Sequence, residues 1–166
     1  MQAEELGSLT LFAGLTRDQL EHLARLFEVI DYPAGAQIFA AGDRASQLYI
    51  AQTGEVVIRY RPYDGGSIDI ATIPAGGAFG WSAALKRAYY TSSAVCRTDV
   101  RALTIRAHDL HQIMADDPEV GGVLLERTAL IAGSRLDSLG QQVVRLFQSK
   151  TPPRRRPRSA SAPPMR

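Results

Sequence analysis

The chain has 166 residues, of which 45% are apolar, and a formal net charge of +2, as expected for about one globular domain with a short appendage. All 17 acidic residues but only 13 of the 19 basic ones precede residue 150, so this main part carries a net charge of −4. A mildly acidic body does not favour nucleic-acid binding, and no apolar run approaches the ~20 residues of a membrane span.

The first predicted helix begins at a capping box, in which Thr16 caps the helix and Gln19 reaches back to it. The helical pattern is then continued by Leu20, Leu23, Phe27 and Ile30. Since the helix is expected to begin at Thr16, residues 1–15 form an N-terminal lead. Tyr32-Pro33 ends the helical pattern, so the helix is expected to run towards the proline.

Between residues 33 and about 105, short apolar runs alternate with turn residues at intervals of about ten. These runs are GAQIF, GDRASQLYIA, TGEVVIRY and DGGSIDIATI. Asp64-Gly65-Gly66 separates two alternating runs and predicts a hairpin, and Val100 to Ile105 is the last predicted strand. The spacing favours an antiparallel barrel or sandwich.

Two helices are predicted to close the domain. The first covers roughly His108 to Ala115, and the second begins after Asp117-Pro118, where Asp caps and Pro occupies the first helical position. The second helix is expected over 118–148, with a heptad of Leu125, Ala129, Ala132, Leu136, Leu139, Val143 and Leu146. It could pack on its own domain, but its length favours a homodimer. Residues 149–166, rich in Pro, Ser and Arg, are expected to be a disordered basic tail.

The order of these elements resembles that of the cyclic nucleotide-binding domain family. The matching stretches are LFAGLT before the first helix, Pro33-Ala-Gly35 with Ile38, Gly42-Asp43, LYIAQTGEV at 48–56 and AFG at 78–80. The resemblance covers residues 10 to 148. It implies an α+β fold over 16–117: an antiparallel, jelly-roll-like β-roll flanked by an N-terminal helix and C-terminal helices, one of which is a long dimerisation helix.

The resemblance also implies a phosphate-binding cassette beginning at Phe79-Gly80. In typical members a glutamate follows Phe-Gly and binds the ribose, and an arginine about ten residues later pairs with the phosphate. Here Trp81 occupies the glutamate position and Thr91 the arginine position. The candidate ligand-binding residues are Phe79, Gly80, Trp81, Ser82, Ala83, Thr91, Ser92 and Ser93, with Arg87, Tyr90 and Arg135 as further candidate contacts.

Three interpretations of this cassette remain open. It could bind a different ligand, with Trp81 as a stacking platform and hydroxyl groups as donors. Trp81 could instead fill the site and leave a ligand-free dimerisation and protein-interaction module. The cassette could also still bind a cyclic nucleotide, with Lys86 or Arg87 as the substitute cation. The first interpretation is preferred, so the expected function is a non-catalytic, ligand-sensing regulatory domain whose ligand need not be cAMP or cGMP. No specific cofactor is expected, and the candidate ligands are a cyclic nucleotide or another small anionic molecule.

Other candidate sites have simpler explanations. His108 and His111 could share a metal, but two histidines on a polar helix face are more often solvated, so no metal is expected. Cys96 is the single cysteine of the sequence, so an internal disulfide is excluded. It is expected to be a buried structural thiol, with a redox switch as the alternative. The acidic N-terminus lacks the pattern of a secretion signal, so a cytoplasmic protein is expected. No set of catalytic residues is evident, and no DNA-binding domain is expected after the long helix.

Overall fold

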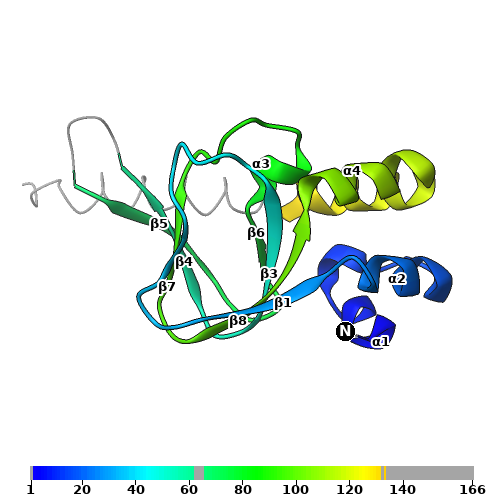
Figure 1. Ribbon diagram of the computed structural model, residues 1–166, viewed down its shortest axis with the longest axis horizontal. Helices are drawn as coiled ribbons and strands as arrows, with labels where there is room; N and C mark the ends of the chain where they lie inside the picture. Colours follow the sequence, from blue (N-terminus) through cyan, green and yellow to red (C-terminus); the bar gives the residue numbers. More distant parts are fainter. Residues whose placement is uncertain (1, 62–65, 132, 134–166) are drawn as a thin grey trace, which may run out of the picture.

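The domain is a β-roll of two four-stranded antiparallel sheets with its helices gathered at one end (Figure 1). The computed structural model describes residues 2–61, 66–131 and 133. The first sheet has the order β1 (Glu28–Tyr32), β8 (Val100–Arg106), β3 (Gln47–Thr53) and β6 (Ala78–Phe79). The second has the order β2 (Gln37–Phe39), β7 (Ser93–Cys96), β4 (Val56–Tyr60) and β5 (Ile68–Ile73). The predicted α+β class and antiparallel roll are confirmed.

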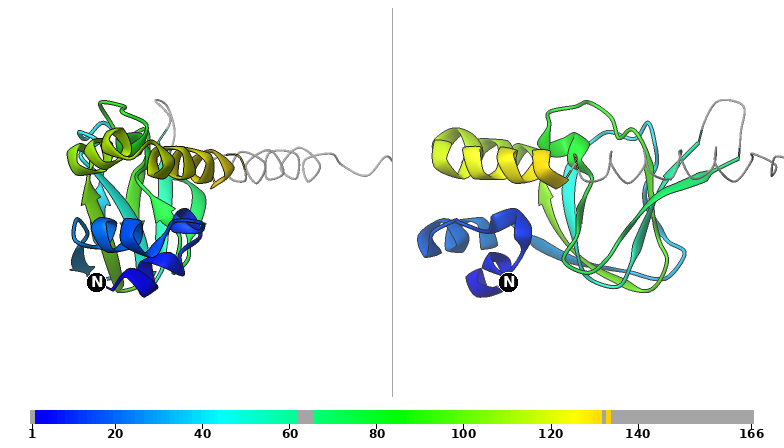
Figure 2. Two further views of the ribbon diagram at one scale, coloured as in Figure 1. Left: turned by 90° about the vertical axis from the view of Figure 1, so that its right-hand side faces the viewer. Right: turned by 180° about the vertical axis from the view of Figure 1, so that it is seen from behind.

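The helices come from both ends of the described chain and meet beside the roll (Figure 2). On the N-terminal side lie α1 (Ala3–Gly7), the 3-10 turn η1 (Thr10–Phe12) and α2 (Arg17–Ala24). On the C-terminal side lie α4 (Ala107–Asp116) and a helix over residues 118–131. The single-turn helix α3 (Trp81–Ala84) lies where the roll meets this helical end. None of the described helices is long and apolar enough to cross a bilayer.

The predicted first helix begins at the expected residue but ends too early to include Phe27 and Ile30. The capping box of Thr16 and Gln19 is present, and α2 ends at Ala24. Ile30 instead lies in β1, opposite Ala102 of β8. The apolar spacing of three and four therefore continued by coincidence into a strand, and pairing with a segment some 70 residues away decided its conformation. The N-terminal lead also contains α1, whose Leu6 is fully buried.

Two hydrophobic cores hold the domain together. One lies between the helices and the first sheet and includes Phe12, Leu23, Ile50 and Leu103. The other fills the inside of the roll and contains a group of aromatic rings from Phe39, Tyr49, Phe79 and Tyr90. Helix α3 touches both cores, because Ala84 belongs to the first and Ala83 to the second.

Asp117 joins the beginning of the C-terminal helix to α2. Its Oδ1 accepts from the amides of Glu119 and Val120 at 3.0 and 3.1 Å, and its Oδ2 accepts from Gln19 Nε2 at 3.0 Å. The predicted Asp-Pro start of this helix is therefore confirmed. Of the predicted heptad, Leu125 and Ala129 are exposed. Ala132, the heptad positions from Leu136 on, Arg135 and the tail lie outside the described residues.

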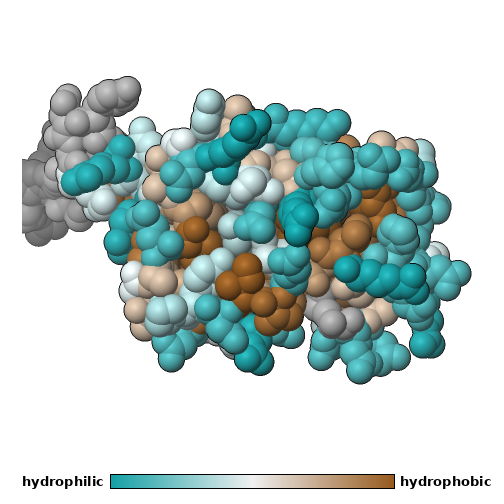
Figure 3. Space-filling view, viewed as in Figure 1, coloured by the Kyte–Doolittle hydropathy of each residue, from teal (hydrophilic) through white to brown (hydrophobic). Residues whose placement is uncertain are grey.

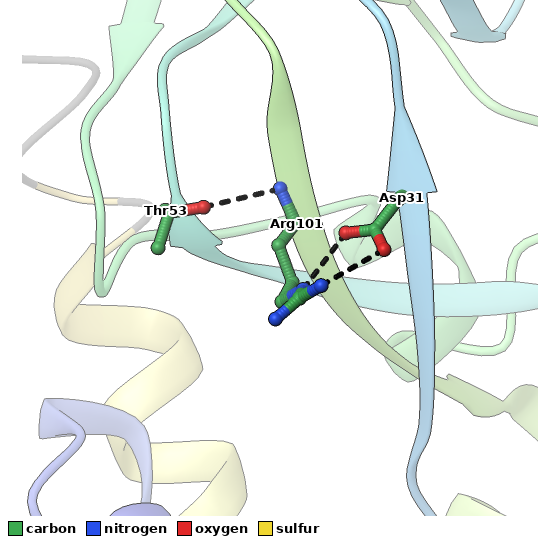
Figure 4. A network of polar contacts seen from close by, with 3 residues as sticks. All are labelled: Asp31, Thr53 and Arg101. Atoms are coloured by element: carbon green, nitrogen blue, oxygen red, sulfur yellow. Dashed lines mark hydrogen bonds and ion pairs between the residues drawn. The ribbon is translucent and has the colours of Figure 1, made fainter.

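The register of the first sheet is reinforced by a cross-strand ion pair (Figure 4). Asp31 of β1 lies opposite Arg101 of β8. The Arg101 Nε and Nη2 atoms donate to the two Asp31 carboxylate oxygens at 2.8 and 3.0 Å. The backbone amide of Arg101 also donates to Thr53 Oγ1 of β3, at 3.4 Å. These contacts tie three adjacent strands together at the surface, and the Arg101 guanidinium lowers the pKa of Asp31.

Candidate functional site

The cassette turn is built around Gly80, which has a φ of 79° and caps helix α3. A Cβ at this position would lie 3.0 Å from Tyr49 Cδ2 and 3.1 Å from the Gln47 carbonyl oxygen. The left-handed conformation and this close approach both favour glycine. After one turn, the Arg87 amide donates to the Ser82 carbonyl at 2.9 Å and Lys86 takes a φ of 56°. The chain therefore reverses sharply on both sides of α3.

A cavity of about 180 Å³ lies directly against this turn. Of the predicted cassette residues, it brings together Gly80, Trp81, Ser82, Thr91 and Ser92, together with the candidate contact Tyr90. The other lining residues come from the second sheet: Phe39, Ile58, Ile70 and Ala71. The cavity thus lies between the helix α3 turn, the segment before β7, and strands β2, β4 and β5.

The described lining of this cavity contains no charged side chain. Its side-chain polar groups are the hydroxyls of Ser82, Thr91 and Ser92, the indole of Trp81 and the phenol of Tyr90. Trp81 is half-buried and also packs against the core between the helices and the first sheet. The site can therefore offer neutral hydrogen bonds and apolar contact, and it lacks an ionic partner for an anion.

The wall formed by Tyr90 is fixed by hydrogen bonds. The Tyr90 hydroxyl donates to the Gln47 carbonyl at 2.6 Å and accepts from the Gln47 amide at 3.1 Å. Its ring stacks on Phe39, with a centroid separation of 3.8 Å. Burial raises the pKa of Tyr90 and, more strongly, that of Tyr49. Because both phenols are neutral at physiological pH and the Tyr90 hydroxyl is occupied, only the Tyr90 ring is offered to a ligand.

Other predicted site residues lie away from the cavity. Phe79 and Ala83 are buried behind its lining. The Ser93 hydroxyl accepts from the Ala41 amide at 3.0 Å, which fixes the loop after β2. Arg87 and Lys86, in the loop after α3, line a separate and larger hollow.

The apolar residues from β2, β4 and β5 were missed by sequence reasoning. Ile58 and Ile70 lie where the pairing of β4 with β5 shifts by one residue, so that Ile58 faces Ala71, Arg59 faces Asp69, and Ile70 has no Cα partner. An irregularity of this kind changes which side chains face inward. The alternation of the two strands could have identified them as roll strands but not which residues line the cavity.

The surroundings of Cys96 and His111 indicate structural roles for both residues. Cys96 is a buried free cysteine, and burial is the main cause of the raised pKa of its thiol. A raised pKa disfavours the reactive thiolate. The His111 Nε2 atom lies 3.3 Å from the Ala84 carbonyl oxygen, which connects α4 to α3. Within the described ranges, no group of three or more histidine, cysteine or acidic side chains could hold a metal.

Comparison with known proteins identifies the family. The family model described as "Cyclic nucleotide-binding domain" matches residues 29–117, which includes the whole cassette. A CRP-like cAMP-activated global transcriptional regulator of Mycobacterium tuberculosis is 30% identical over 122 residues, which cover 74% of this chain and 54% of the regulator. The chain therefore spans about half the length of this curated relative.

Solved structures agree with this assignment. A cyclic nucleotide-binding protein from Geobacter metallireducens is 29% identical, with a TM-score of 0.73 over 82% of this chain and 98% of that one. A cyclic nucleotide-binding domain from Methylobacillus flagellatus shares the fold, with a TM-score of 0.74 at 20% identity over 90% of this chain and 83% of that one. The chain belongs to the cyclic nucleotide-binding domain family, whose members are ligand-sensing regulatory domains.

Proposed function

We propose that this domain is a non-catalytic ligand sensor whose cassette binds a small, uncharged or weakly polar molecule in preference to cAMP or cGMP. The observation that carries the proposal is the neutral lining of the cassette cavity, which includes Trp81 and Thr91, the residues that the resemblance aligns with the acid and the arginine. The fold and the glycine turn are those of a ligand site, and on this proposal neutral side chains stand in place of the charged contacts.

The loss of the charged contacts has a large expected effect on affinity. A hydrogen bond to a charged group contributes roughly 1.5–3 kcal/mol, so the absence of two such contacts weakens a cyclic nucleotide by about 100-fold or more. The indole of Trp81 has one donor and no acceptor, and the Thr91 hydroxyl cannot form the bidentate bonds of a guanidinium. Lys86 and Arg87 lie in the other hollow, so a substitute cation would require this turn to rearrange.

The cavity also restricts the size of the ligand. Its volume of about 180 Å³ is below the roughly 300–1,000 Å³ of a typical small-molecule site. A small apolar molecule with one or two hydrogen-bond acceptors fits the Ser82, Thr91 and Ser92 hydroxyls and the surrounding isoleucines. A larger ligand would have to displace Trp81.

We further propose that the chain forms a homodimer through residues 118–148. Within the described helix, Leu125 is 50% exposed and Leu130 57% exposed, whereas Val120 and Leu124 face the domain's own core. The two exposed leucines lie on either side of the buried face, and exposed leucines on a helix that already buries one face are available to a second partner. A ligand that favours one position of this helix would then shift its population.

The dimer is tested by light scattering of Leu125→Asp. A charge in the apolar interface should give the monomer mass, while Glu126→Ala, a change at the neighbouring exposed position, should leave the dimer intact. A monomeric unmodified chain, or a dimeric Leu125→Asp variant, would show that this helix is not the interface.

The ligand is tested by native mass spectrometry of the purified chain, followed by calorimetry with any molecule found. The proposal predicts a bound small molecule that is released by Ser92→Trp, a change that should fill the cavity, and retained by Ser67→Trp, a change at an exposed position outside the cavity lining. A charged nucleotide as the bound species would overturn it.

A second candidate function is a ligand-free module for dimerisation and protein interaction. It is favoured by the small cavity volume and by the packing of Trp81 against the core. This alternative predicts a native mass spectrum without any bound small molecule. It also predicts that adding cAMP, cGMP or cyclic dinucleotides leaves the thermal stability unchanged.

A further inference from the structure

A basic groove lies beside the cassette, against Ala83 of helix α3 and the exposed loop that follows this helix. It has a volume of about 870 Å³ and is formed by three segments: residues 44–47, residues 83–88, and the junction of β8 with α4. Figure 3 shows hydrophilic side chains along the upper edge of this face, among paler ones near α3 and the start of α4. We define the basic groove by its cationic side chains, Arg44, Lys86, Arg87 and Arg106, with His108 and His111 at its α4 side.

The charge of this groove is unbalanced. The lining includes four permanent cations and no carboxylate. Among the described residues, the one carboxylate within ion-pair distance of these cations is that of Glu28, whose Oε1 lies 3.3 Å from Arg106 Nη2. Residues before 150 carry a net charge of −4, so the groove concentrates positive charge on an otherwise acidic body. Such a concentration attracts anions and repels basic partners.

The groove is also preorganised by backbone hydrogen bonds between its segments. The Ala45 amide donates to the Ala88 carbonyl at 2.9 Å, and the Ala107 amide donates to the Ser46 carbonyl at 2.8 Å. Lys86 is the single non-glycine residue with a positive φ among those the structure describes. A lysine in this region costs about 1 kcal/mol or more relative to glycine. The cations are therefore carried on segments whose positions are fixed before any partner arrives.

The floor of the groove indicates the kind of partner. The groove is also lined by the small side chains of Ala45, Ala83, Ala88 and Ala107, so an extended main chain can approach its surface closely. The described lining has no phenylalanine, tyrosine or tryptophan ring, the large platforms on which nucleobases stack; its aromatic rings are the two imidazoles of His108 and His111. Several cations along an open, shallow groove suit several carboxylates along one peptide better than one compact phosphate group.

We propose that the basic groove docks an acidic, extended segment of a partner protein. The carboxylates of that segment would pair with Arg44, Lys86 and Arg87, and its backbone would lie over the alanine floor. The docking itself does not depend on the cassette ligand. A coupling between the two would rest on the proposed function: Ala83 lines the groove while Trp81 and Ser82, on the same turn of helix, line the cavity.

The test is fluorescence anisotropy of the full chain with a labelled oligoglutamate of about eight residues, roughly 26 Å when extended. The unmodified chain should bind it saturably, and an oligoglutamine of equal length should not bind. A variant combining Arg44→Gln, Lys86→Gln and Arg87→Gln should bind about tenfold more weakly or worse, because each change removes one charge-assisted contact. All three side chains are exposed, so thermal stability should change little.

The matched control combines Arg25→Gln, Arg61→Gln and Arg97→Gln, which remove the same charge from exposed positions outside the groove. It should keep the affinity of the unmodified chain. All three proteins retain the basic segment after residue 149, so binding that survives the groove variant would assign the peptide to that segment and overturn the proposal. Equal losses in both variants, or saturable binding of inorganic triphosphate without binding of the peptide, would also overturn it.

Discussion

Helix α3 separates two hollows of opposite character. On one side, Trp81 and Ser82 face a cavity of about 180 Å³ with no charged residue in its described lining. On the other, Ala83 contributes to a groove of about 870 Å³ lined by four cations. The family resemblance implies a cation inside the cassette, whereas here the cations nearest in sequence to it, Lys86 and Arg87, lie on the outer side. The backbone turn at α3 can therefore retain the conformation of the family while its nearby cations, Lys86 and Arg87, lie outside the cavity.

The largest expected effect comes from returning charge to the cavity. Trp81→Glu combined with Thr91→Arg restores the two charged positions that the resemblance implies, so cAMP affinity should rise by about 100-fold, the equivalent of two charge-assisted bonds. Calorimetric titration measures this gain. Trp81→Glu with Thr91→Gln is the control, because glutamine is long and polar but uncharged. An unchanged affinity in the first variant would mean that cavity shape, and not charge, excludes the nucleotide.

Gly80→Ala tests whether the turn between the two hollows is rigid. The added Cβ would require an unfavourable backbone conformation and would lie 3.0 Å from Tyr49 Cδ2. We expect the free energy of unfolding to fall by about 2 kcal/mol. Chemical denaturation measures it, with Gly66→Ala as the control, because a Cβ at Gly66 meets no atom within 4 Å. Equal stability of the two variants would show that the turn adapts easily.

Tyr90→Phe tests the wall of the cavity. The change removes the hydroxyl that bonds both backbone groups of Gln47 while the stack on Phe39 remains. The expected loss is about 1–2 kcal/mol of unfolding free energy. The exposed Tyr89 provides the control, since Tyr89→Phe should be close to neutral. A neutral Tyr90→Phe would indicate that water replaces the hydroxyl.

The smallest expected effect is a change in acid stability. Hydrogen bonding from the Val120 amide, and then from Gln19, lowers the pKa of Asp117. Because the folded-state pKa is depressed, this contribution is fully present above the unfolded value of about 3.9 and is lost as pH falls through the folded pKa. Asp117→Asn should therefore reduce the thermal midpoint at pH 6 and flatten its fall towards pH 3. A parallel pair of pH profiles would contradict this assignment.

The sequence predicted the frame of the molecule better than its site. Thr16, Gln19 and Asp117 predicted the helix starts, because a cap depends on residues close in sequence. Ile30 was placed in a helix because its strand conformation depends on pairing with Ala102, which helical periodicity cannot detect. Arg87 was a candidate substitute cation because it lies close to the cassette in sequence, and its place in the outer groove depends on the chain reversal at Lys86, which has a positive φ. Ile70 lines the cavity because the pairing of β4 with β5 shifts by one residue, and the sequence does not show such a shift.

The most direct test of the cassette is a calorimetric titration of cAMP into the unmodified full chain. A neutral cavity with no ionic partner for the phosphate predicts a Kd of about 100 µM or weaker, the value reached by weakening a micromolar site 100-fold or more, so no saturation is expected at low micromolar nucleotide. Saturable binding with a micromolar Kd would contradict the proposed change of ligand and would show that this domain keeps the nucleotide of its family without the two charged residues.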